Sequence, residues 1–291
     1  MDPKPIVKAL RFIYYFFFGF FIILFVFTYF IELLFTPPEK SIRDKIKQKG
    51  YELKFDSVSW KGVSIGYVHA GNDTARRIIL VHGSPGGWNN YYKLLEDETL
   101  LKNYHLIVPD RYGYGLTGGV KGEPDLNIHA EYLHELCKPS EGHLKPIMIG
   151  HSMGGPIVIQ SAINYSNDLE GVISVAGSFD ASLEPNEWFR GLYKTFPLNI
   201  FFSRSLRASN DELFLHKTAL RKMSSEWSKI TCRITIIQGG EDNLVAPCNI
   251  DFAKEKLAGK NADFIYIPNE DHLIPFTDPT PIFTALKKMA N

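Results

Sequence analysis

The chain has 291 residues, 45% of them hydrophobic, and its 32 basic side chains balance its 32 acidic ones. That length and apolar content suffice for one domain with a substantial core, and the balanced charge argues against a nucleic-acid-binding protein. The three cysteines, Cys137, Cys232 and Cys248, have no paired spacing and so give no sign of a disulfide framework.

An uncharged apolar run lies close to the N-terminus, from Phe12 to Ile31. At about 1.5 Å per residue it covers roughly 30 Å, the thickness of the hydrocarbon core of a bilayer. The run is longer than the apolar part of a signal peptide, and no small-residue cleavage site follows it. We therefore predict an uncleaved single-pass membrane anchor over residues 1–38, in contact with lipid at residues 12–35. A cleaved signal and a buried soluble helix are the alternatives.

The charges on either side of the apolar run bear on its orientation. Three basic residues precede the run, and five follow it between residues 40 and 49. By the positive-inside rule, this difference favours a cytoplasmic location for residues 39–291. The basic stretch 40–49 itself fits either contact with anionic headgroups or the solvated face of an amphipathic helix.

Beyond residue 50, apolar runs alternate with helical stretches, which is typical of a parallel sheet with crossover helices. Residues 51–70 predict two antiparallel strands joined by a turn at Lys61-Gly62. Further strands are predicted at 77–81, 106–109, 146–149, 234–237 and 264–267, with another one ending near 175–177, and helices are predicted at 128–137, 156–165 and 250–257.

A serine between two glycines follows the apolar run 146–149, in the segment Gly150-His151-Ser152-Met153-Gly154. A Gly-x-Ser-x-Gly segment between a strand and a helix is typical of a nucleophile elbow, a turn that strains the serine backbone and exposes the hydroxyl. The flanking positions need small residues because strand and helix pass closely there. Ser152 is therefore the candidate nucleophile.

Three further polar segments follow predicted strands. The glycine-rich segment His82-Gly83-Ser84-Pro85-Gly86-Gly87 can turn backbone N–H groups toward a substrate. Glu241-Asp242 follows the next-to-last predicted strand, and Glu270-Asp271-His272 follows the last one. Serine, acid and histidine thus each come after a strand, in the chain order Ser, Asp, His.

With these segments in this order, the chain resembles the α/β-hydrolase family from about Tyr51 to its C-terminus. The turn Asp110-Arg111-Tyr112-Gly113-Tyr114-Gly115 adds to the resemblance. The family implies an α/β-hydrolase fold, a mainly parallel eight-stranded sheet with helices on both faces, here as one domain over residues 39–291. It also implies a helical cap, which we expect at about 179–229, where the alternation of strands and helices stops.

The resemblance implies a Ser-His-Asp triad. Ser152 is the nucleophile, His272 takes up its proton and returns it to the leaving group, and Asp242 orients the imidazole. Glu241, beside Asp242, and Asp180, after an earlier strand, stay open as alternative acids.

The family pattern also assigns an oxyanion hole to two backbone N–H groups, those of Met153 and Ser84. Pro85 has no N–H and cannot serve. His82 and His151 are expected to brace the glycine-rich loop and the elbow rather than to react.

We predict a membrane-anchored serine hydrolase that cleaves carboxylic esters, with lipid-like esters as one option, through an acyl-enzyme. A serine at the elbow argues against the epoxide hydrolases and haloalkane dehalogenases of this fold, which use aspartate.

A proline-type aminopeptidase is the first alternative, because residues 82–87 are similar to that group's loop and Glu184 and Glu187 could receive an amine. The second is a non-catalytic binding or interaction protein. We expect no cofactor and no metal, and the sequence leaves the oligomeric state open.

Overall fold

The computed structural model describes residues 4–34, 37–138, 144–185, 190–191, 194–196 and 198–290. One eight-stranded sheet organises the domain, with the strand order β1-β2-β4-β3-β5-β6-β7-β8. The strands are β1 (Lys54–Trp60), β2 (Val63–Gly71), β3 (Arg76–Val81), β4 (Tyr104–Pro109), β5 (Ile147–His151), β6 (Gly171–Val175), β7 (Arg233–Gly239) and β8 (Ala262–Ile267).

The sheet is antiparallel at one edge and parallel elsewhere. β1 and β2 form a hairpin, whose turn residues Lys61 and Gly62 both have positive φ, 45° and 82°, as a two-residue type I′ turn requires. β2 pairs antiparallel with β4, and the six strands from β4 to β8 in the sheet order pair in parallel. The predicted mainly parallel eight-stranded sheet is confirmed.

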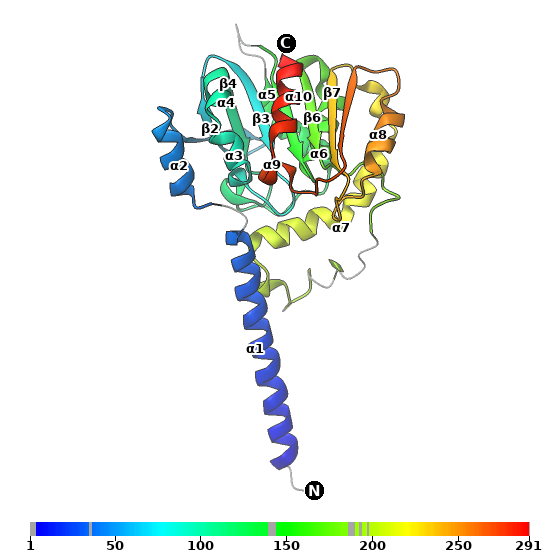
Figure 1. Ribbon diagram of the computed structural model, residues 1–291. Helices are drawn as coiled ribbons and strands as arrows, with labels where there is room; N and C mark the ends of the chain where they lie inside the picture. The colour runs from blue at the N-terminus through cyan, green and yellow to red at the C-terminus, as the bar shows by residue number, and fades with distance from the viewer. Residues whose placement is uncertain are drawn as a thin grey trace.

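Helices cover both faces of this sheet, and each face holds its own apolar core (Figure 1). On one face pack α5 (Leu126–Cys137), α6 (Gly154–Tyr165) and α8 (Asn249–Lys256). On the other pack α2 (Glu39–Gln48), α3 (Tyr92–Leu95), α4 (Glu98–Asn103) and α10 (Thr280–Ala290). Short 3-10 helices lie at η1 (Trp88–Tyr91), η2 (Gly115–Thr117) and η3 (Ser166–Asp168).

The alternation of strands and helices stops between β6 and β7, as predicted for a helical cap. The described residues there form η5 (Leu198–Phe201), α7 (Arg204–Ser224) and η6 (Trp227–Lys229). α7 runs across the end of the sheet at which α9 (Ile274–Thr277) begins (Figure 1). The limits of the cap, 179–229, stay a prediction, because residues 186–189, 192–193 and 197 lie outside the described part of the chain.

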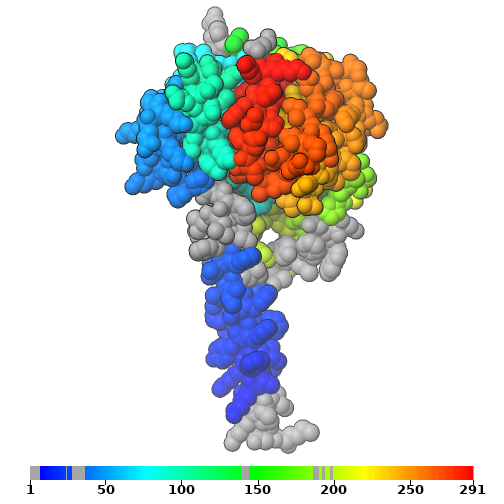
Figure 2. All heavy atoms as spheres, in the orientation of Figure 1, coloured from blue at the N-terminus to red at the C-terminus, as the bar shows by residue number. Residues whose placement is uncertain are grey.

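α1 (Lys4–Leu34) projects from the domain as one long helix (Figures 1 and 2). Its stretch Val7–Phe27 has a mean hydropathy of 2.2 and none of it is buried, so by length and composition it can cross a membrane. A signal sequence would pass the same test. α1 meets the domain at η5, where the rings of Phe21 and Phe201 stack with their centroids 4.5 Å apart.

The basic stretch after the apolar run forms α2, an amphipathic helix docked on the domain. Ile42 and Ile46 are fully buried in the core. Arg43 donates a hydrogen bond to the carbonyl oxygen of Leu53 at 3.0 Å, and Lys45 forms an exposed ion pair. α2 is therefore part of the domain rather than of the connection to α1.

Candidate active site

Ser152 lies in the turn between β5 and α6, and its backbone has a φ of 53°. That left-handed conformation is strained for a residue with a side chain. A Cβ atom at Gly150 would lie 2.1 Å from the carbonyl oxygen of Gly154, and one at Gly154 would lie 2.1 Å from that of Val81. Both positions therefore require glycine, which is the packing expected at a nucleophile elbow.

The ring of His272 is hydrogen-bonded to Asp242, with 2.8 Å between its Nδ1 and Oδ2 of the carboxylate. Asp242 follows β7, and its Oδ1 accepts the N–H groups of Leu244 and Val245 at 2.9 and 2.8 Å. Burial would raise the pKa of Asp242, but the hydrogen bonds from His272 and from the backbone outweigh it and lower that pKa. Asp242 is thus an ionised acceptor, and the carboxylate leaves Nε2 of His272 free to accept a proton.

The two alternative acids lie elsewhere. Asp180 uses its carboxylate to accept the N–H of Ser182 at 2.7 Å, an interaction within its own turn. Glu241 is exposed, and within the described residues neither it nor Asp180 is hydrogen-bonded to His272. Of the three acids, Asp242 is the one in contact with the His272 ring.

His151 connects the elbow to His272. Its Nε2 donates to the carbonyl oxygen of His272 at 2.9 Å, and the two ring centroids are 4.9 Å apart. Burial lowers the pKa of His151 to about 3, so its ring is neutral and acts as a brace, as expected. The neighbouring Ser152 hydroxyl is half-buried and has no hydrogen-bond partner among the described residues. Bonds from a nucleophile to its base are often long without substrate.

The glycine-rich loop after β3 lies against the elbow. A Cβ atom at Gly83 would lie 3.0 Å from the Cβ of Ser152, so loop and elbow are in direct contact. His82 braces the loop, since its Nδ1 donates to the carbonyl oxygen of Gly83 at 2.8 Å. Across the described part of the chain, the N–H groups of Ser84 and Met153 donate no hydrogen bond, so both are available to a ligand.

A buried network of charged and hydroxyl groups supports this loop from the cap. Glu212 of α7 and Arg111, which follows β4, are both fully buried and form an ion pair. Nη2 of Arg111 lies 3.1 Å from Glu212 Oε2, and that oxygen also accepts the hydroxyls of Tyr114 and Ser84, each at 2.8 Å. One carboxylate therefore holds α7, the turn after β4 and the loop after β3 together.

Arg111 also holds the loop directly. It donates to the carbonyl oxygens of His82 and Gly83 at 2.9 and 2.8 Å. Burial raises the pKa of Glu212, and Arg111 opposes this rise; Glu212 in turn keeps the pKa of Arg111 above its ordinary value, although burial acts to lower it. The sequence interpretation did not single out Glu212. A signal exists, because Glu212 stands between Ala208 and His216 on the buried face of α7, where spacing predicts apolar residues.

Asp110 makes the backbone contacts of a turn residue. Its Oδ1 accepts the N–H of Trp88 at 2.6 Å and its Oδ2 that of Leu116 at 2.8 Å. Burial raises the pKa of Asp110 to about 6, against the effect of those two hydrogen bonds. Asp110 thus connects the glycine-rich loop to the turn after β4.

One cluster in the described part of the chain has the side chains of a metal site. His69, Asp73 and His105 hold their potential ligand atoms within 4.8 Å of one another. Nδ1 of His69 and Nε2 of His105 are already hydrogen-bonded at 2.9 Å. His105 stands at the start of β4, whereas Ser152 follows the end of β5. The cluster therefore lies at the opposite end of the strands from the elbow.

Comparison with known proteins places the chain in a family. A family model described as alpha/beta hydrolase fold matches residues 76–275, well over half of the chain. The chain belongs to the α/β-hydrolase fold family.

The chain is 32% identical over 139 residues to a proline iminopeptidase of Saccharolobus solfataricus, covering 45% of this chain and 44% of that protein. It is 27% identical over 148 residues to Lipase 3 of a Moraxella species, covering 50% and 46%. The match thus spans less than half the length of these relatives.

Two solved structures illustrate the shared fold. A membrane phospholipase A, described as a bacterial virulence factor, superposes with a TM-score of 0.65 at 17% identity and covers 99% of both chains. A lipase-esterase related protein from Clostridium acetobutylicum superposes with a TM-score of 0.63 at 17% identity, covering 77% of this chain and 99% of its own. At such identities the likeness concerns the fold alone.

Proposed function

We propose that this α/β hydrolase is a membrane-anchored serine hydrolase that cleaves carboxylic esters through an acyl-enzyme. The observation that carries the proposal is the strained Ser152 elbow beside a histidine that is hydrogen-bonded to a buried carboxylate. Nucleophile, base and acid with these partners are the parts of a Ser-His-Asp triad.

In this mechanism the Ser152 hydroxyl attacks the carbonyl carbon of the ester while Nε2 of His272 takes up its proton. Asp242 keeps the ring in the Nδ1–H tautomer and stabilises the imidazolium. His272 then gives the proton to the leaving alcohol, which leaves an acyl group on Ser152. Water, activated by the same ring, hydrolyses the acyl-enzyme.

The N–H groups of Ser84 and Met153 donate hydrogen bonds to the negative oxygen of each tetrahedral intermediate. Both donors are unpaired in the described residues, and Met153 is the N-cap of α6, where backbone N–H groups have no partner within the helix. Losing one such donor typically costs about 2.7–4 kcal/mol of transition-state stabilisation.

We further propose that α1 anchors the enzyme in a membrane, with the side of the domain that carries α7 and α9 toward the bilayer (Figure 1). The length and composition of Val7–Phe27 support this reading. A membrane location favours lipid-like esters as substrates. The flanking charges favour a cytoplasmic domain, and this orientation is also part of the proposal.

The anchor is testable by deletion of residues 1–38. α2 keeps its buried residues Ile42 and Ile46, so we expect a folded protein whose kcat/KM on a short water-soluble ester stays within a few-fold of the full chain in detergent. Turnover of a bilayer lipid should fall, because tethering no longer raises the local concentration. Loss of short-ester turnover by a protein that keeps its circular dichroism would contradict a simple tether.

A proline-type aminopeptidase is the second candidate, and the identity to a proline iminopeptidase favours it. Glu187, one of the two glutamates expected to receive the substrate amine, lies outside the described residues. The buried cap carboxylate of Glu212 is already occupied by Arg111, Tyr114 and Ser84, so it is not available to an amine. This contact removes Glu212, but not Glu184, from the groups that could bind an amine.

A fluorophosphonate probe separates an enzyme from a non-catalytic binding protein. We expect covalent labelling of the wild type and none of Ser152→Ala. Kinetics on p-nitrophenyl esters of graded acyl length, compared with prolyl amides, then separate the two enzymes. Ester turnover that is absent while prolyl amides are cleaved would replace the esterase by the peptidase, and a protein that neither reacts nor turns over would be a binding module.

A further inference from the structure

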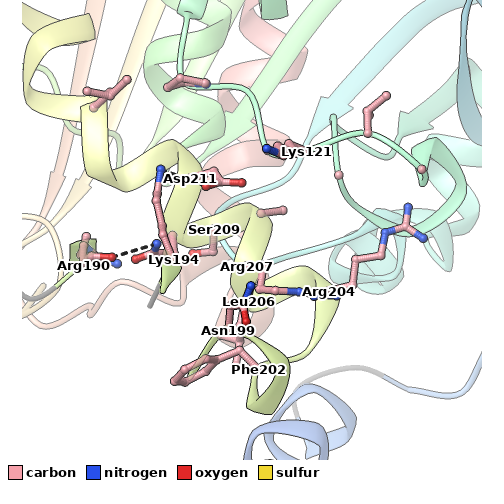
Figure 3. Close-up of a pocket in the computed structure, with 18 residues that line it drawn as sticks. Lys121, Arg190, Lys194, Asn199, Phe202, Arg204, Leu206, Arg207, Ser209 and Asp211 are labelled. Atoms are coloured by element: carbon pink, nitrogen blue, oxygen red, sulfur yellow. Dashed lines mark hydrogen bonds and ion pairs between the residues drawn. The ribbon is translucent and has the colours of Figure 1, made fainter. Parts of the chain in front are cut away.

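A basic cavity of about 850 Å³ opens beside the first half of α7 (Figure 3). Its walls come from the stretch 119–124, from Arg190 and Lys194, from η5 and from α7, and the triad residues do not line it. Among the side chains that line it, five are basic and one is acidic: Lys121, Arg190, Lys194, Arg204, Arg207 and Asp211.

Most of this positive charge is not neutralised by the protein. Lys194 forms an ion pair with Asp211 at 3.0 Å. Within the described residues, the side chains of Lys121, Arg204 and Arg207 form no hydrogen bond and no ion pair. Like charges gathered around one cavity repel one another, and an anion bound among them removes that repulsion. The charge therefore fits a ligand with a phosphate or another strong anion.

Two asparagines that line the cavity have a buried side-chain oxygen without a hydrogen-bond donor. Asn210 is 6% exposed; its Nδ2 donates to the carbonyl oxygen of Arg190 at 3.2 Å, but its buried Oδ1 has no partner. The buried Oδ1 of Asn199, on η5, has none either. Unpaired buried acceptors are uncommon, and a ligand that carries hydroxyl groups near its phosphate would supply the missing donors.

The position of η5 relates the cavity to α1. Phe201 of η5 stacks on Phe21, and the adjoining residues Asn199 and Phe202 line the cavity. Phe21 lies within the apolar run Phe12–Ile31, ten residues before its end, which is about 15 Å along a helix at 1.5 Å per residue. With α1 in a bilayer, η5 therefore lies at the depth of the acyl chains. α7, which carries much of the cavity wall, lies level with the C-terminal end of α1 and therefore nearer the headgroups (Figure 1).

The surface of this segment fits such a location. Phe196 is 82% exposed and Ile200 53% exposed, although both are large and apolar. Exposed apolar side chains gathered beside a membrane helix are typical of a surface that enters the lipid interface, with basic residues at headgroup level.

From these observations we propose that the basic cavity binds the headgroup of an anionic phospholipid, with phosphate and hydroxyl groups as in a phosphoglycerol headgroup. The lipid belongs to the bilayer that holds α1, so the inference rests on the membrane anchor of the proposed function. The bound headgroup fixes the start of α7 at the membrane surface.

The test uses the full chain with Ser152→Ala in detergent, so that no added lipid can be turned over. The ligands are dihexanoyl phosphatidylglycerol, dihexanoyl phosphatidylcholine and inorganic phosphate, and Kd is measured from the shift of the unfolding temperature. The charge variant is Lys121→Gln/Arg204→Gln/Arg207→Gln. The matched control is Lys102→Gln/Lys145→Gln/Lys287→Gln, which removes the same charge from exposed lysines that do not line the cavity.

We expect the parent and the control to bind phosphatidylglycerol about tenfold or more tightly than phosphatidylcholine, and the charge variant to lose this preference. An unchanged preference in the charge variant would overturn the proposal. Inorganic phosphate binding as tightly as phosphatidylglycerol would also overturn it, because the cavity would then be a site for free anions.

A second readout reports depth and does not depend on the charges. A nitroxide is attached at Phe196→Cys in the full chain in phosphatidylglycerol vesicles, with Cys232 and Cys248 replaced by serine and Tyr266→Cys as an exposed control. We expect position 196 to be accessible to oxygen and shielded from a water-soluble nickel chelate, and position 266 the reverse. Equal access to the chelate would refute the placement of the cap in the interface.

Turnover of a short ester separates this proposal from the proposed function. With Ser152 intact, the charge variant should hydrolyse p-nitrophenyl butyrate at the wild-type rate. Inactivity of wild type and variant alike, together with a lost lipid preference in the variant, refutes the esterase and supports the cavity. Normal activity of both proteins, together with an unchanged lipid preference in the variant, supports the esterase and refutes the cavity as a lipid site.

Discussion

Replacing Glu212 by glutamine is expected to weaken both the fold and the chemistry. The carboxylate is fully buried, pairs with Arg111 and accepts the hydroxyls of Tyr114 and Ser84 at 2.8 Å. An amide keeps one acceptor oxygen, but it loses the negative charge and turns an NH2 group toward groups that are themselves donors. Arg111 is then buried without a counter-charge.

The size of the effect follows from this burial. Removing one partner of a buried ion pair typically costs about 3–5 kcal/mol, a large part of the roughly 5–15 kcal/mol by which a native protein is stable. For the chemistry, Ser84 bonds to Glu212 through its hydroxyl and carries a proposed oxyanion donor on its backbone. A displacement of about 1 Å at such a donor can lower the rate by about 10²-fold, so we expect a fall in kcat of about 10- to 100-fold with little change in KM.

Urea unfolding of the full chain in detergent gives the free energy of unfolding, and p-nitrophenyl butyrate gives kcat and KM. Glu241→Gln removes the same charge from an exposed side chain and should resemble wild type. Arg111→Met/Glu212→Met should recover stability but not kcat, because the loop carbonyls that Arg111 bonds lose their donor. A Glu212→Gln protein within about 1 kcal/mol of wild type and with unchanged kcat would refute the reasoning.

Three further outcomes are expected. Ser152→Ala and His272→Ala should each lower kcat by several orders of magnitude while far-ultraviolet circular dichroism is unchanged, because the triad acts as a unit. Asp242→Asn should lower kcat by about 10⁴-fold through the wrong histidine tautomer. An inactive Glu241→Gln protein would instead identify Glu241 as the acid of the triad. Asp110, whose pKa burial raises to about 6, keeps a proton in the folded state that the unfolded chain loses near pH 4. Its contribution to stability is therefore complete below about pH 4 and declines by up to about 3 kcal/mol as the pH rises through 6. Urea midpoints of wild type and Asp110→Asn should show a difference that changes across this range, and a constant difference would contradict it.

The sheet could be predicted from the sequence because its signals are local. Near-continuous apolar runs such as β5 and β6 are what strands buried on both faces require, and the turn at Lys61-Gly62 marks a hairpin. The order in which serine, acid and histidine follow their strands also placed all three at one edge of a parallel sheet. The contact between His272 and Asp242 is implied by the family resemblance, and the structure has these two side chains hydrogen-bonded.

The partners of the cap could not be predicted in this way. Glu212 and Ser84 are 128 residues apart in the chain, and their hydrogen bond depends on how α7 docks across the end of the sheet. Helical periodicity assigns Glu212 to the buried face of α7, but it does not tell which buried groups that face meets. The stack of Phe21 on Phe201 likewise depends on tertiary packing between two apolar segments. Taken alone, the sequence of each segment predicts only that its side chains contact lipid or are buried.

The two faces of α7 connect the proposed chemistry to the proposed membrane surface. Successive residues of a helix point about 100° apart, so neighbours in sequence can serve different surroundings. Asp211 lines the basic cavity, while Glu212 accepts hydrogen bonds from hydroxyl groups of the glycine-rich loop and of the turn after β4. η5 precedes α7 in the chain and contacts α1. Because the two faces of α7 have separate surroundings, we expect substitutions on the cavity face to change lipid preference and substitutions on the Glu212 face to change ester turnover.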